Sequence, residues 1–319
     1  MEKVVLGIDI GGTNTEIGFV TEQGEVVTSA HTPTLTNTDF KHYFNALVKA
    51  IRRAEQGLKG DYKVIGAGIG APNGNYLNGC IENAVNLGWG DKVPIIDMLK
   101  EEFGYEVCVL SNDANAAAVG EMIFGGAKEF KNYIMLTLGT GLGSGIIING
   151  QLVVGTDGNA GELGHMTVVP GGRECGCGHL GCLENYCSAT GMVRTALEFM
   201  AYNKVPSVLR DIKPSDLTSK DIFDAAQAGD SIALDTFQYT GEILGAAIND
   251  MITFSSPEAV VLFGGPTKAG DFILTPTIES MKANKRKFMK NEVKVLISEL
   301  DGAQAAVLGA AAMAWKDIQ

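Results

Sequence analysis

Residues 161–184 hold the side chains whose types and spacing are best suited to chemistry. Four of them are metal ligands, one imidazole and three thiols: His165, Cys175, Cys177 and Cys182. Such a set completes the tetrahedral coordination of a structural zinc ion and leaves no position open for a catalytic water. His179 lies in the same loop and is an alternative to His165 as the fourth ligand. We predict that zinc fixes this glycine-rich loop and, with it, the directions of two flanking carboxylates, Glu162 and Glu184.

Disulfide bonds are the alternative use for the six cysteines of the chain. Disulfides belong to oxidising compartments. The N-terminus shows no secretory signal, because a single basic residue, Lys3, precedes a short apolar run that is interrupted at Asp9. Closely spaced cysteines beside a histidine, without such a signal, indicate a metal site in a reducing compartment. We therefore expect a cytoplasmic protein.

Two glycine-rich loops form a second candidate site. Each follows one apolar run and precedes another: Asp9 to Thr15 in the first half of the chain, and Gly139 to Gly145 near the middle. Glycine backbone amides and the hydroxyls of Thr13 and Thr140 can hold phosphate groups, and a carboxylate at a strand end can hold a hydrated divalent cation. One such loop alone is equally typical of a tight hairpin turn. The repeated pattern predicts two related lobes that face a shared cleft.

A carboxylate at the start of a helix is the candidate general base. An apolar run at 107–110 ends in Ser111, and Asp113 then opens an alanine-rich segment. The simpler alternative is that Asp113 only caps the helix, although a cap can also serve as a base.

The apolar patterns predict the elements that position these residues. Strands are expected at 4–10, around 17–19 and 26–27, and at 64–72, 107–110, 134–138, 146–148, 259–263 and 292–297. Helices are expected at 38–55, 97–103, 189–200, 219–228, 231–253 and 304–316. Asn37 or Thr38 is the expected cap of the first helix, and Asp301 of the last one. Another strand-to-glycine turn, at Gly264 and Gly265, is a further place for a nucleotide.

The charge of the chain argues against two kinds of binding partner, nucleic acids and membrane surfaces. The chain has 319 residues and a net charge of −12, from 25 basic and 37 acidic side chains. Its longest basic run is Lys285–Lys287. Nucleic-acid grooves and membrane-surface patches need clustered positive charge, so we expect neither partner. An anionic nucleotide is compatible with this charge, because backbone amides and a metal ion can hold phosphates.

In this order and spacing, the motifs resemble the ROK (repressor, open reading frame, kinase) family of sugar kinases. The resemblance covers nearly the whole chain, and its most specific part is Cys175-Gly-Cys-Gly-His-Leu-Gly-Cys-Leu-Glu184. It implies an α/β, two-lobed actin-like ATPase or hexokinase (ribonuclease H-like) fold with an interlobe cleft. It also implies ATP, catalytic Mg²⁺ and structural Zn²⁺ as cofactors, and a homodimer.

The resemblance also implies residue roles. Asp113 would take the proton from a sugar hydroxyl, and His165 would bind zinc with one ring nitrogen and face the sugar with the other. The implied substrate-binding residues are Pro72, Asn86, Asn112, Asp113, Glu162, His165 and Glu184. The implied nucleotide-binding residues are Asp9, Gly11, Gly12, Thr13, Asn14, Gly139, Thr140, Gly141, Gly264 and Gly265. The loop at Asn86 lacks a proline that many relatives have there, which bears on sugar preference.

The expected activity is therefore ATP-dependent phosphorylation of a hexose, with glucose as the leading substrate. N-acetylmannosamine, N-acetylglucosamine, fructose and allose are alternatives within the same chemistry. A sugar-responsive transcriptional repressor is the alternative of a different class, and the position of the first phosphate loop at residue 9 argues against it. We expect a smaller lobe at 1–118, joined by the C-terminal helix 303–319, and a larger lobe at 119–302.

Overall fold

The computed structural model describes residues 1–84, 87–300 and 304–318. The chain divides into two compact units. Unit 1 comprises Met1–Lys131, Gly145–Gly161 and Ser298–Gln319, and unit 2 comprises Asn132–Ser144 and Glu162–Ile297. The lobe boundaries expected from the sequence, and a cleft between the lobes, stay predictions.

Unit 1 is built on a mixed five-stranded sheet. Its order is β3 (Val26–Pro33), β2 (Asn14–Thr21), β1 (Glu2–Ile10), β4 (Tyr62–Gly70) and β8 (Val107–Ser111). The first three strands form an antiparallel meander, whereas β1, β4 and β8 are parallel. A small antiparallel sheet also belongs to this unit: β5 (Gly74–Asn75), β6 (Cys80–Glu82) and β7 (Lys92–Val93).

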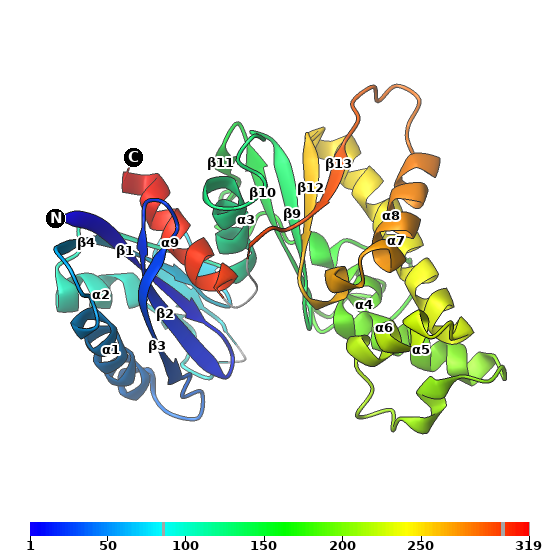
Figure 1. Ribbon diagram of the computed structural model, residues 1–319, viewed down its shortest axis with the longest axis horizontal. Coiled ribbons are helices and arrows are strands. Elements are labelled where there is room, and N and C mark those ends of the chain that lie inside the picture. Colours follow the sequence, from blue (N-terminus) through cyan, green and yellow to red (C-terminus); the bar gives the residue numbers. More distant parts are fainter. Residues whose placement is uncertain (85–86, 301–303, 319) are drawn as a thin grey trace. The chain divides into compact units, whose positions relative to one another are not determined.

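Helices cover both faces of the large sheet in unit 1. On one face lie α1 (Phe40–Gln56) and α2 (Ile95–Phe103), and on the other lie α3 (Asp113–Ile123) and α9 (Ala305–Ile318) (Figure 1). The C-terminal helix α9 approaches the sheet closely because Gly68 has no side chain. A Cβ atom at this position would lie less than 3.0 Å from the carbonyl oxygen of Ala310. Close packing of an alanine-rich helix returns the end of the chain to the unit that contains its beginning.

A second five-stranded sheet runs in the order β11 (Gln151–Leu152), β10 (Leu142–Ile148), β9 (Tyr133–Leu138), β12 (Ala259–Phe263) and β13 (Lys294–Ile297). The parallel strand β12 lies between β9 and β13.

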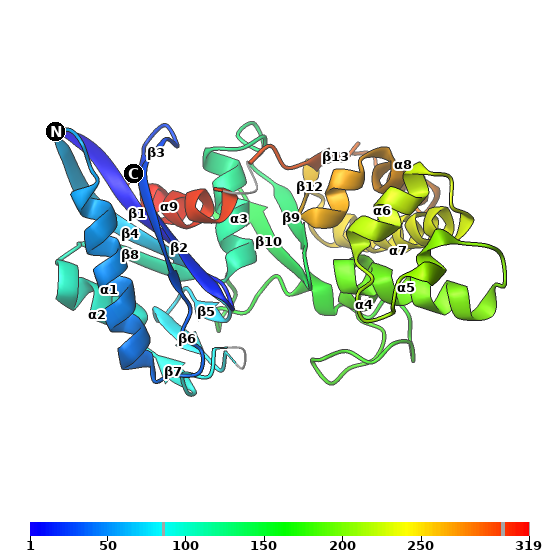
Figure 2. The same ribbon diagram turned by 60° about the horizontal axis from the view of Figure 1, so that its bottom comes forward.

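The helices of unit 2 are α4 (Glu184–Cys187), α5 (Ala189–Tyr202), α6 (Ser219–Gln227), α7 (Ser231–Ser255) and α8 (Asp271–Ala283). Three short 3₁₀ helices accompany them: η1 (Leu163–His165), η2 (Val208–Asp211) and η3 (Gly265–Ala269). The long helix α7 packs along α8 and contacts α5 and α6 (Figure 2).

The structure corrects the predicted cap of α1 and adds elements that the patterns did not indicate. Asp39, and neither Asn37 nor Thr38, caps α1 by accepting a hydrogen bond from the amide of His42. The predicted cap Asp301 lies outside the described residues. Helix α8 and the small sheet β5–β7 were not predicted.

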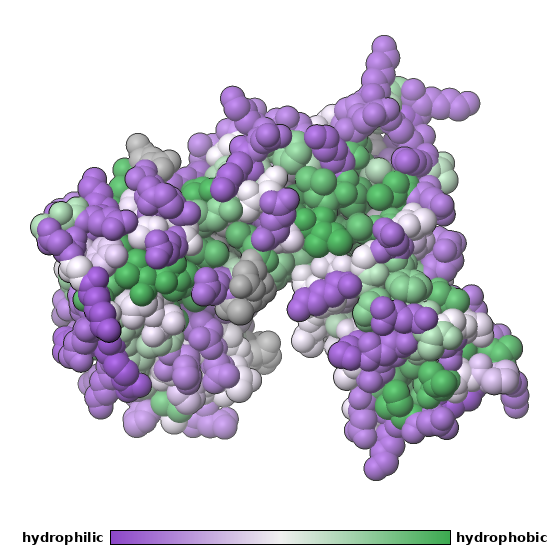
Figure 3. Space-filling model, viewed as in Figure 1, coloured by the Kyte–Doolittle hydropathy of each residue, from purple (hydrophilic) through white to green (hydrophobic). Residues whose placement is uncertain are grey.

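The basic run Lys285–Lys287 lies on the segment between α8 and β13, where the surface is hydrophilic (Figure 3, upper right). Arg286 forms an ion pair of 2.7 Å with Asp250, and Lys285 donates to the carbonyl of Asn291. Among the helices that the structure describes, none is long and apolar enough to cross a membrane.

Candidate functional site

Two carboxylates meet at one edge of the sheet in unit 1. Parallel pairing places Asp9 of β1 beside Gly70 of β4, and Gly70 beside Ser111 of β8. The carboxyl ends of these strands therefore lie level, and Asp113 follows two residues later at the start of α3. A Cβ atom built on Gly70 would lie 3.5 Å from Oδ1 of Asp9 and 3.8 Å from Cα of Asp113. Gly70 thus lies between the two aspartates. Ligands of open α/β sheets bind at such an edge.

Loss of hydration disfavours the charge of both aspartates, and neighbouring carboxylates add to this at Asp9. The pKa of Asp9 is raised to about 7, first by burial and then by the neighbouring carboxylates of Asp113 and Glu16. Burial also raises the pKa of Asp113, although the amide of Ala114, which donates to its Oδ1 over 2.8 Å, acts in the opposite direction. A carboxylate with a raised pKa is a stronger proton acceptor when it is ionised, which suits a general base.

Asn112, and not Asp113, caps α3. The side-chain oxygen of Asn112 accepts a hydrogen bond of 2.7 Å from the amide of Asn115. The alternative that Asp113 serves only as the cap is therefore wrong. The oxygen of Asn112 is committed to the helix, so its amide NH₂ group is the part available to a ligand.

The first glycine loop closes through one of its own amides. Gly11 donates to the carbonyl of Asn14 over 3.0 Å, and Thr34 donates to the carbonyl of Thr13 over 2.8 Å. Within the described residues, the amides of Gly12 and Thr13 have no hydrogen-bond acceptor in the protein. These two amides, rather than that of Gly11, are the donors suited to a phosphate group.

The second glycine loop closes in a similar way in unit 2. Gly139 donates to the carbonyl of Gly141 over 2.9 Å. The beginning of α5 holds this loop, because the amide of Ala189 donates to the carbonyl of Gly139 and the hydroxyl of Thr190 to that of Thr140. In each of the two loops, therefore, the amide of the first glycine donates a hydrogen bond that closes a tight turn.

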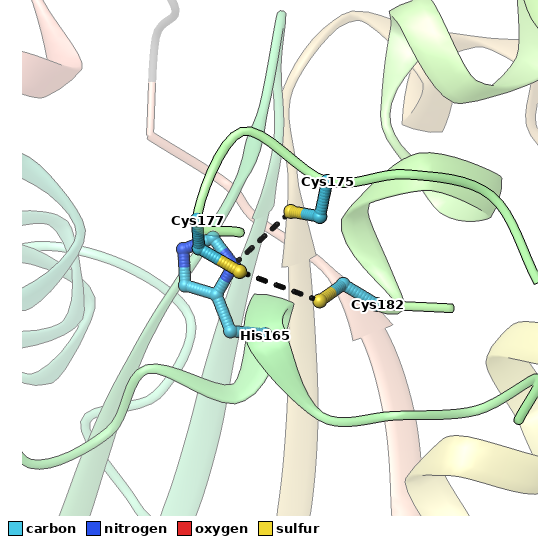
Figure 4. Close-up of side chains that lie close together, drawn as sticks. All are labelled: His165, Cys175, Cys177 and Cys182. Carbon is cyan, nitrogen blue, oxygen red and sulfur yellow. Dashed lines mark hydrogen bonds between the residues drawn. The ribbon is translucent and has the colours of Figure 1, made fainter. Parts of the chain in front are cut away.

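The predicted metal ligands come together in unit 2. Ligand atoms of His165, Cys175, Cys177 and Cys182 all lie within 4.8 Å of one another (Figure 4). His179 is exposed and lies outside this cluster. All the cysteines are free thiols.

The distances within the cluster fit a tetrahedral zinc ion. With Zn–S bonds of about 2.3 Å and Zn–N bonds of about 2.0–2.1 Å, two sulfur atoms lie about 3.8 Å apart and a sulfur and a nitrogen about 3.6 Å apart. The Sγ atoms of Cys177 and Cys182 are separated by 3.6 Å, and Sγ of Cys175 lies 3.6 Å from Nδ1 of His165. Because Nδ1 faces the thiols, the Nε2 nitrogen of the imidazole is left for another partner.

Glu184 links the cysteine loop to the second glycine loop. Its Oε2 accepts a hydrogen bond of 2.9 Å from the amide of Leu142, and its Oε1 lies 4.0 Å from Sγ of Cys175. A Cβ atom on Gly141 would lie less than 3.0 Å from Oε2, so a larger residue there would displace this carboxylate. One oxygen of Glu184 therefore has a structural contact in addition to its predicted role in substrate binding.

Arg173 anchors the cysteine loop. The only sign of this role in the sequence is a single basic residue among the predicted ligands. The side chain of Arg173 is buried with only 7% of its surface exposed. Its guanidinium lies over the ring of Tyr186 and forms hydrogen bonds with Glu198, Thr195 and the carbonyl of Asn185. These contacts hold the loop on α4 and α5 without any contribution from the thiols.

The remaining predicted residues lie at loops. Pro72 follows β4, Glu162 precedes η1, and Gly264 joins β12 to η3. Gly264 has a φ angle of 114°, which favours glycine, and no atom lies within 4 Å of a Cβ position built on Gly265. Asn86 lies outside the described residues.

The predicted site residues form two sets, one in each unit. Unit 1 holds Asp9, Gly11, Gly12, Thr13, Asn14, Pro72, Asn112 and Asp113. Unit 2 holds Gly139, Thr140, Gly141, Glu162, His165, Cys175, Cys177, Cys182, Glu184, Gly264 and Gly265.

The sequence and the fold of this chain are similar to those of known proteins. The profile of the ROK family matches residues 5–317. The chain belongs to the ROK family. A glucokinase from Halalkalibacterium halodurans is 39% identical to this ROK protein over 315 residues, which make up 97% of this chain and 94% of the relative. A xylose repressor from Caldicellulosiruptor bescii is 29% identical over 98% of this chain and 78% of its own length, so regulators also resemble it.

Solved structures agree on the fold. A ROK family glucokinase from Streptomyces griseus, determined in complex with glucose and AMPPNP, superposes with a TM-score of 0.80. It is 33% identical and covers 98% of this chain and 99% of its own. This ROK protein therefore has the α/β, two-lobed hexokinase-like fold, with two mixed five-stranded sheets. Its cysteine–histidine cluster is consistent with a structural zinc ion.

Replacing Cys182 with serine is expected to abolish zinc binding, because a buried thiolate ligand is lost from a closed four-ligand site. Zinc would be measured by mass spectrometry of the purified, desalted protein, in which the unaltered chain should carry one ion. Cys108→Ser is the matched control, since Cys108 lies in β8, away from the cluster, and this variant should keep its zinc. Full zinc content in Cys182→Ser would contradict the assignment.

Replacing Asp9 with asparagine is expected to stabilise unit 1 at pH 8 and to have little effect at pH 4. The folded-state pKa of Asp9 is raised from 3.8 to about 7, so its ionised form destabilises the folded state. This penalty is absent below about pH 4, grows between pH 4 and 7, and is complete above pH 7. A shift of three pKa units corresponds to about 4 kcal/mol, and we expect about 2–4 kcal/mol after partial solvent screening.

Denaturant unfolding of the metal-free protein, followed by tryptophan fluorescence, measures this effect. The only two tryptophans, Trp89 and Trp315, both lie in unit 1. The control is Glu22→Gln, at an exposed position between β2 and β3, which should behave like the unaltered protein at both pH values. An equal effect of Asp9→Asn at pH 4 and pH 8 would show that the carboxylate carries no such penalty.

Proposed function

We propose that this ROK protein transfers the γ-phosphoryl group of ATP to a hexose, with glucose as the substrate and glucose 6-phosphate as the product. The observation that carries the proposal is the pair of carboxylates with raised pKa values, Asp9 and Asp113, at the carboxyl edge of a sheet whose neighbouring loop presents the amides of Gly12 and Thr13. Glucokinase relatives at 39% and 33% identity support the substrate.

Asp113 is the proposed general base. Phosphoryl transfer depends mainly on positioning and on charge stabilisation. A base therefore needs to accept one proton from a hydroxyl group of the sugar that is held in place. The amide of Ala114 fixes the carboxylate of Asp113 through Oδ1, and burial raises its pKa. Its Oδ2 is then the atom that would receive the proton of the sugar 6-hydroxyl.

Asp9 is the proposed anchor for Mg²⁺, through water molecules. When bound, Mg²⁺ supplies charge neutralisation for the transferring phosphoryl group. The donor chemistry fits, because carboxylate oxygens are the ligands that Mg²⁺ prefers and Asp9 lies where two other carboxylates already disfavour its charge. A nearby cation would allow Asp9 to stay ionised at neutral pH.

Loop amides are the proposed contacts for the phosphates of ATP. Gly12 and Thr13 offer them in unit 1, and Thr140 and Gly141 in unit 2, while the turn at Gly264 and Gly265 would accept the adenosine. Gly11, Asn14 and Gly139 would shape these loops.

Sugar recognition is assigned to Asn112, Glu162, His165 and Glu184, together with Pro72 and Asn86. A zinc ion bound to Nδ1 of His165 leaves the proton on Nε2, so the imidazole would donate a hydrogen bond to a sugar oxygen. Zinc would therefore act on recognition by fixing a tautomer. It would take no part in the transfer itself.

The proposal keeps the other expectations from the sequence. These are a homodimer, a cytoplasmic location, and lobes at 1–118 with 303–319 and at 119–302. The extent of unit 1, which includes both the beginning of the chain and α9, supports the lobe assignment. Kinases for N-acetylmannosamine, N-acetylglucosamine, fructose or allose are the alternatives, and the xylose repressor relative raises a regulatory one.

A panel of sugars tests the function. ADP release would be coupled to NADH oxidation with Mg²⁺ and ATP, and with glucose, mannose, fructose, allose, N-acetylglucosamine or N-acetylmannosamine. We expect kcat/KM for glucose to lead by at least tenfold, which corresponds to about 1.4 kcal/mol of transition-state binding. Another leading sugar would reassign the substrate. No turnover by zinc-loaded, folded protein would exclude the kinase and favour a sugar-binding regulator.

Replacing Asp113 with asparagine tests the base. We expect kcat to fall by about 10²- to 10⁴-fold, the range that general-base catalysis contributes. Zinc content and the Kd for glucose, measured by calorimetry, should stay within about twofold, because the substitution keeps the shape of the side chain. Near-normal kcat in this variant would exclude Asp113 as the base.

A further inference from the structure

A buried chain of hydroxyl groups leads away from the first glycine loop, and the reaction as described does not use it. The hydroxyl of Thr15 lies 2.9 Å from that of Thr34 and 2.9 Å from that of Tyr43. Thr15 and Tyr43 are fully buried, and Thr34 is 4% exposed. The group therefore joins three elements: the start of β2, the segment after β3, and α1.

The same group fixes the loop from two sides. Thr15 is the last residue of the loop, and the amide of Thr34 donates to the carbonyl of Thr13. Tyr43 is close enough to Asp9 for that charge to act on it, since burial and the carboxylate both raise the pKa of Tyr43. The phenol therefore stays protonated and can donate its hydrogen bond.

Tyr43 also contacts the segment that follows the sugar-side residue Asn86. Its ring stacks on that of Trp89 with a centroid separation of 4.2 Å and an interplanar angle of 24°. The indole Nε1 of Trp89 donates to the carbonyl of Leu35 over 3.3 Å. One residue thus presents its ring face to the sugar-side segment and its hydroxyl to the phosphate-side loop.

A closed circuit of contacts results. From Trp89 one path runs through the ring of Tyr43 to Thr15, and the other runs through Leu35 and Thr34 to Thr13. Both paths end on the first glycine loop. Because buried hydrogen bonds and stacked rings each have one preferred geometry, the circuit holds this loop and the Trp89 segment in a fixed relation.

We propose that Tyr43 is a positioning residue that holds the first glycine loop in its phosphate-binding conformation against the segment carrying Trp89. The inference rests on the proposed function and deepens it, because it assigns ATP binding in part to a side chain that touches no phosphate. Removal of the phenolic hydroxyl leaves the ring stack in place and frees the loop on one side. ATP binding then weakens while sugar binding persists.

The test is Tyr43→Phe in the full-length, zinc-loaded protein, assayed with the sugar that the unaltered protein prefers. We expect KM for ATP to rise about 3- to 10-fold, the range that one neutral hydrogen bond produces. KM for the sugar should stay within about twofold. Thr15→Val should act in the same direction, and adding Tyr43→Phe to it should cause no further rise, since the two hydroxyls share one interaction.

Tyr76→Phe is the matched control. The hydroxyl of Tyr76 also forms hydrogen bonds in unit 1, at 3.2 Å from the carboxylate of Asp317, but it lies on the α9 side. This variant should leave both KM values unchanged. An unchanged KM for ATP in Tyr43→Phe would overturn the inference. A parallel rise of both KM values with a lowered melting temperature would also overturn it, because this would indicate a purely structural role. No turnover by the unaltered protein would instead refute the proposed function.

Discussion

The parallel register of β1, β4 and β8 is the constraint on which the unit 1 site depends. It brings Asp9, Gly70 and Ser111 to one level, so that the carboxylates of Asp9 and Asp113 share one edge of the sheet. Two like charges in such a place are unfavourable, and burial adds to the cost. Neither hydrophobic packing nor helix capping requires this arrangement, because Asn112 already caps α3. A fold that maintains an electrostatic penalty at one edge is more readily explained by a function that uses the charges than by stability.

In unit 2, the structural requirement is to hold the long glycine-rich cysteine loop, residues 161–184, in one conformation. Two independent anchors do so. The four ligands of the cluster close one part of the loop, and Arg173 fixes another part to α4 and α5 through carbonyl, hydroxyl and carboxylate partners. Glu184 then connects this loop to the second glycine loop through the amide of Leu142. The cysteine loop and the second glycine loop are therefore in contact through one side chain, so a change at one thiol should reach the loop at Gly141.

The sequence predicted what depends on local spacing and missed what depends on contacts across the chain. Cys175, Cys177 and Cys182 lie within eight positions of one another, so the sequence alone predicted that they form one metal site. The strand β12 was predicted with its observed bounds because its apolar run is uninterrupted. By contrast, Tyr43 meets Thr15 from 28 positions away, and Arg173 finds its partners only once α5 is in place. Helix α8 was missed because a proline, Pro276, lies in its interior. This proline packs against Gly241 of α7, a contact that cannot be seen in the sequence.

The two glycine loops contain similar turns, but different contacts hold them in place. In both, the first glycine amide closes the turn, and the next two amides have no acceptor among the described residues. The supports differ. Buried hydroxyls and an aromatic stack hold the first loop, whereas the beginning of α5 and a glutamate hold the second. Hydroxyl networks have a specific geometry and tolerate few substitutions, because an unpaired buried hydroxyl is costly. The first loop, which begins at Asp9, depends on such a network for its rigidity.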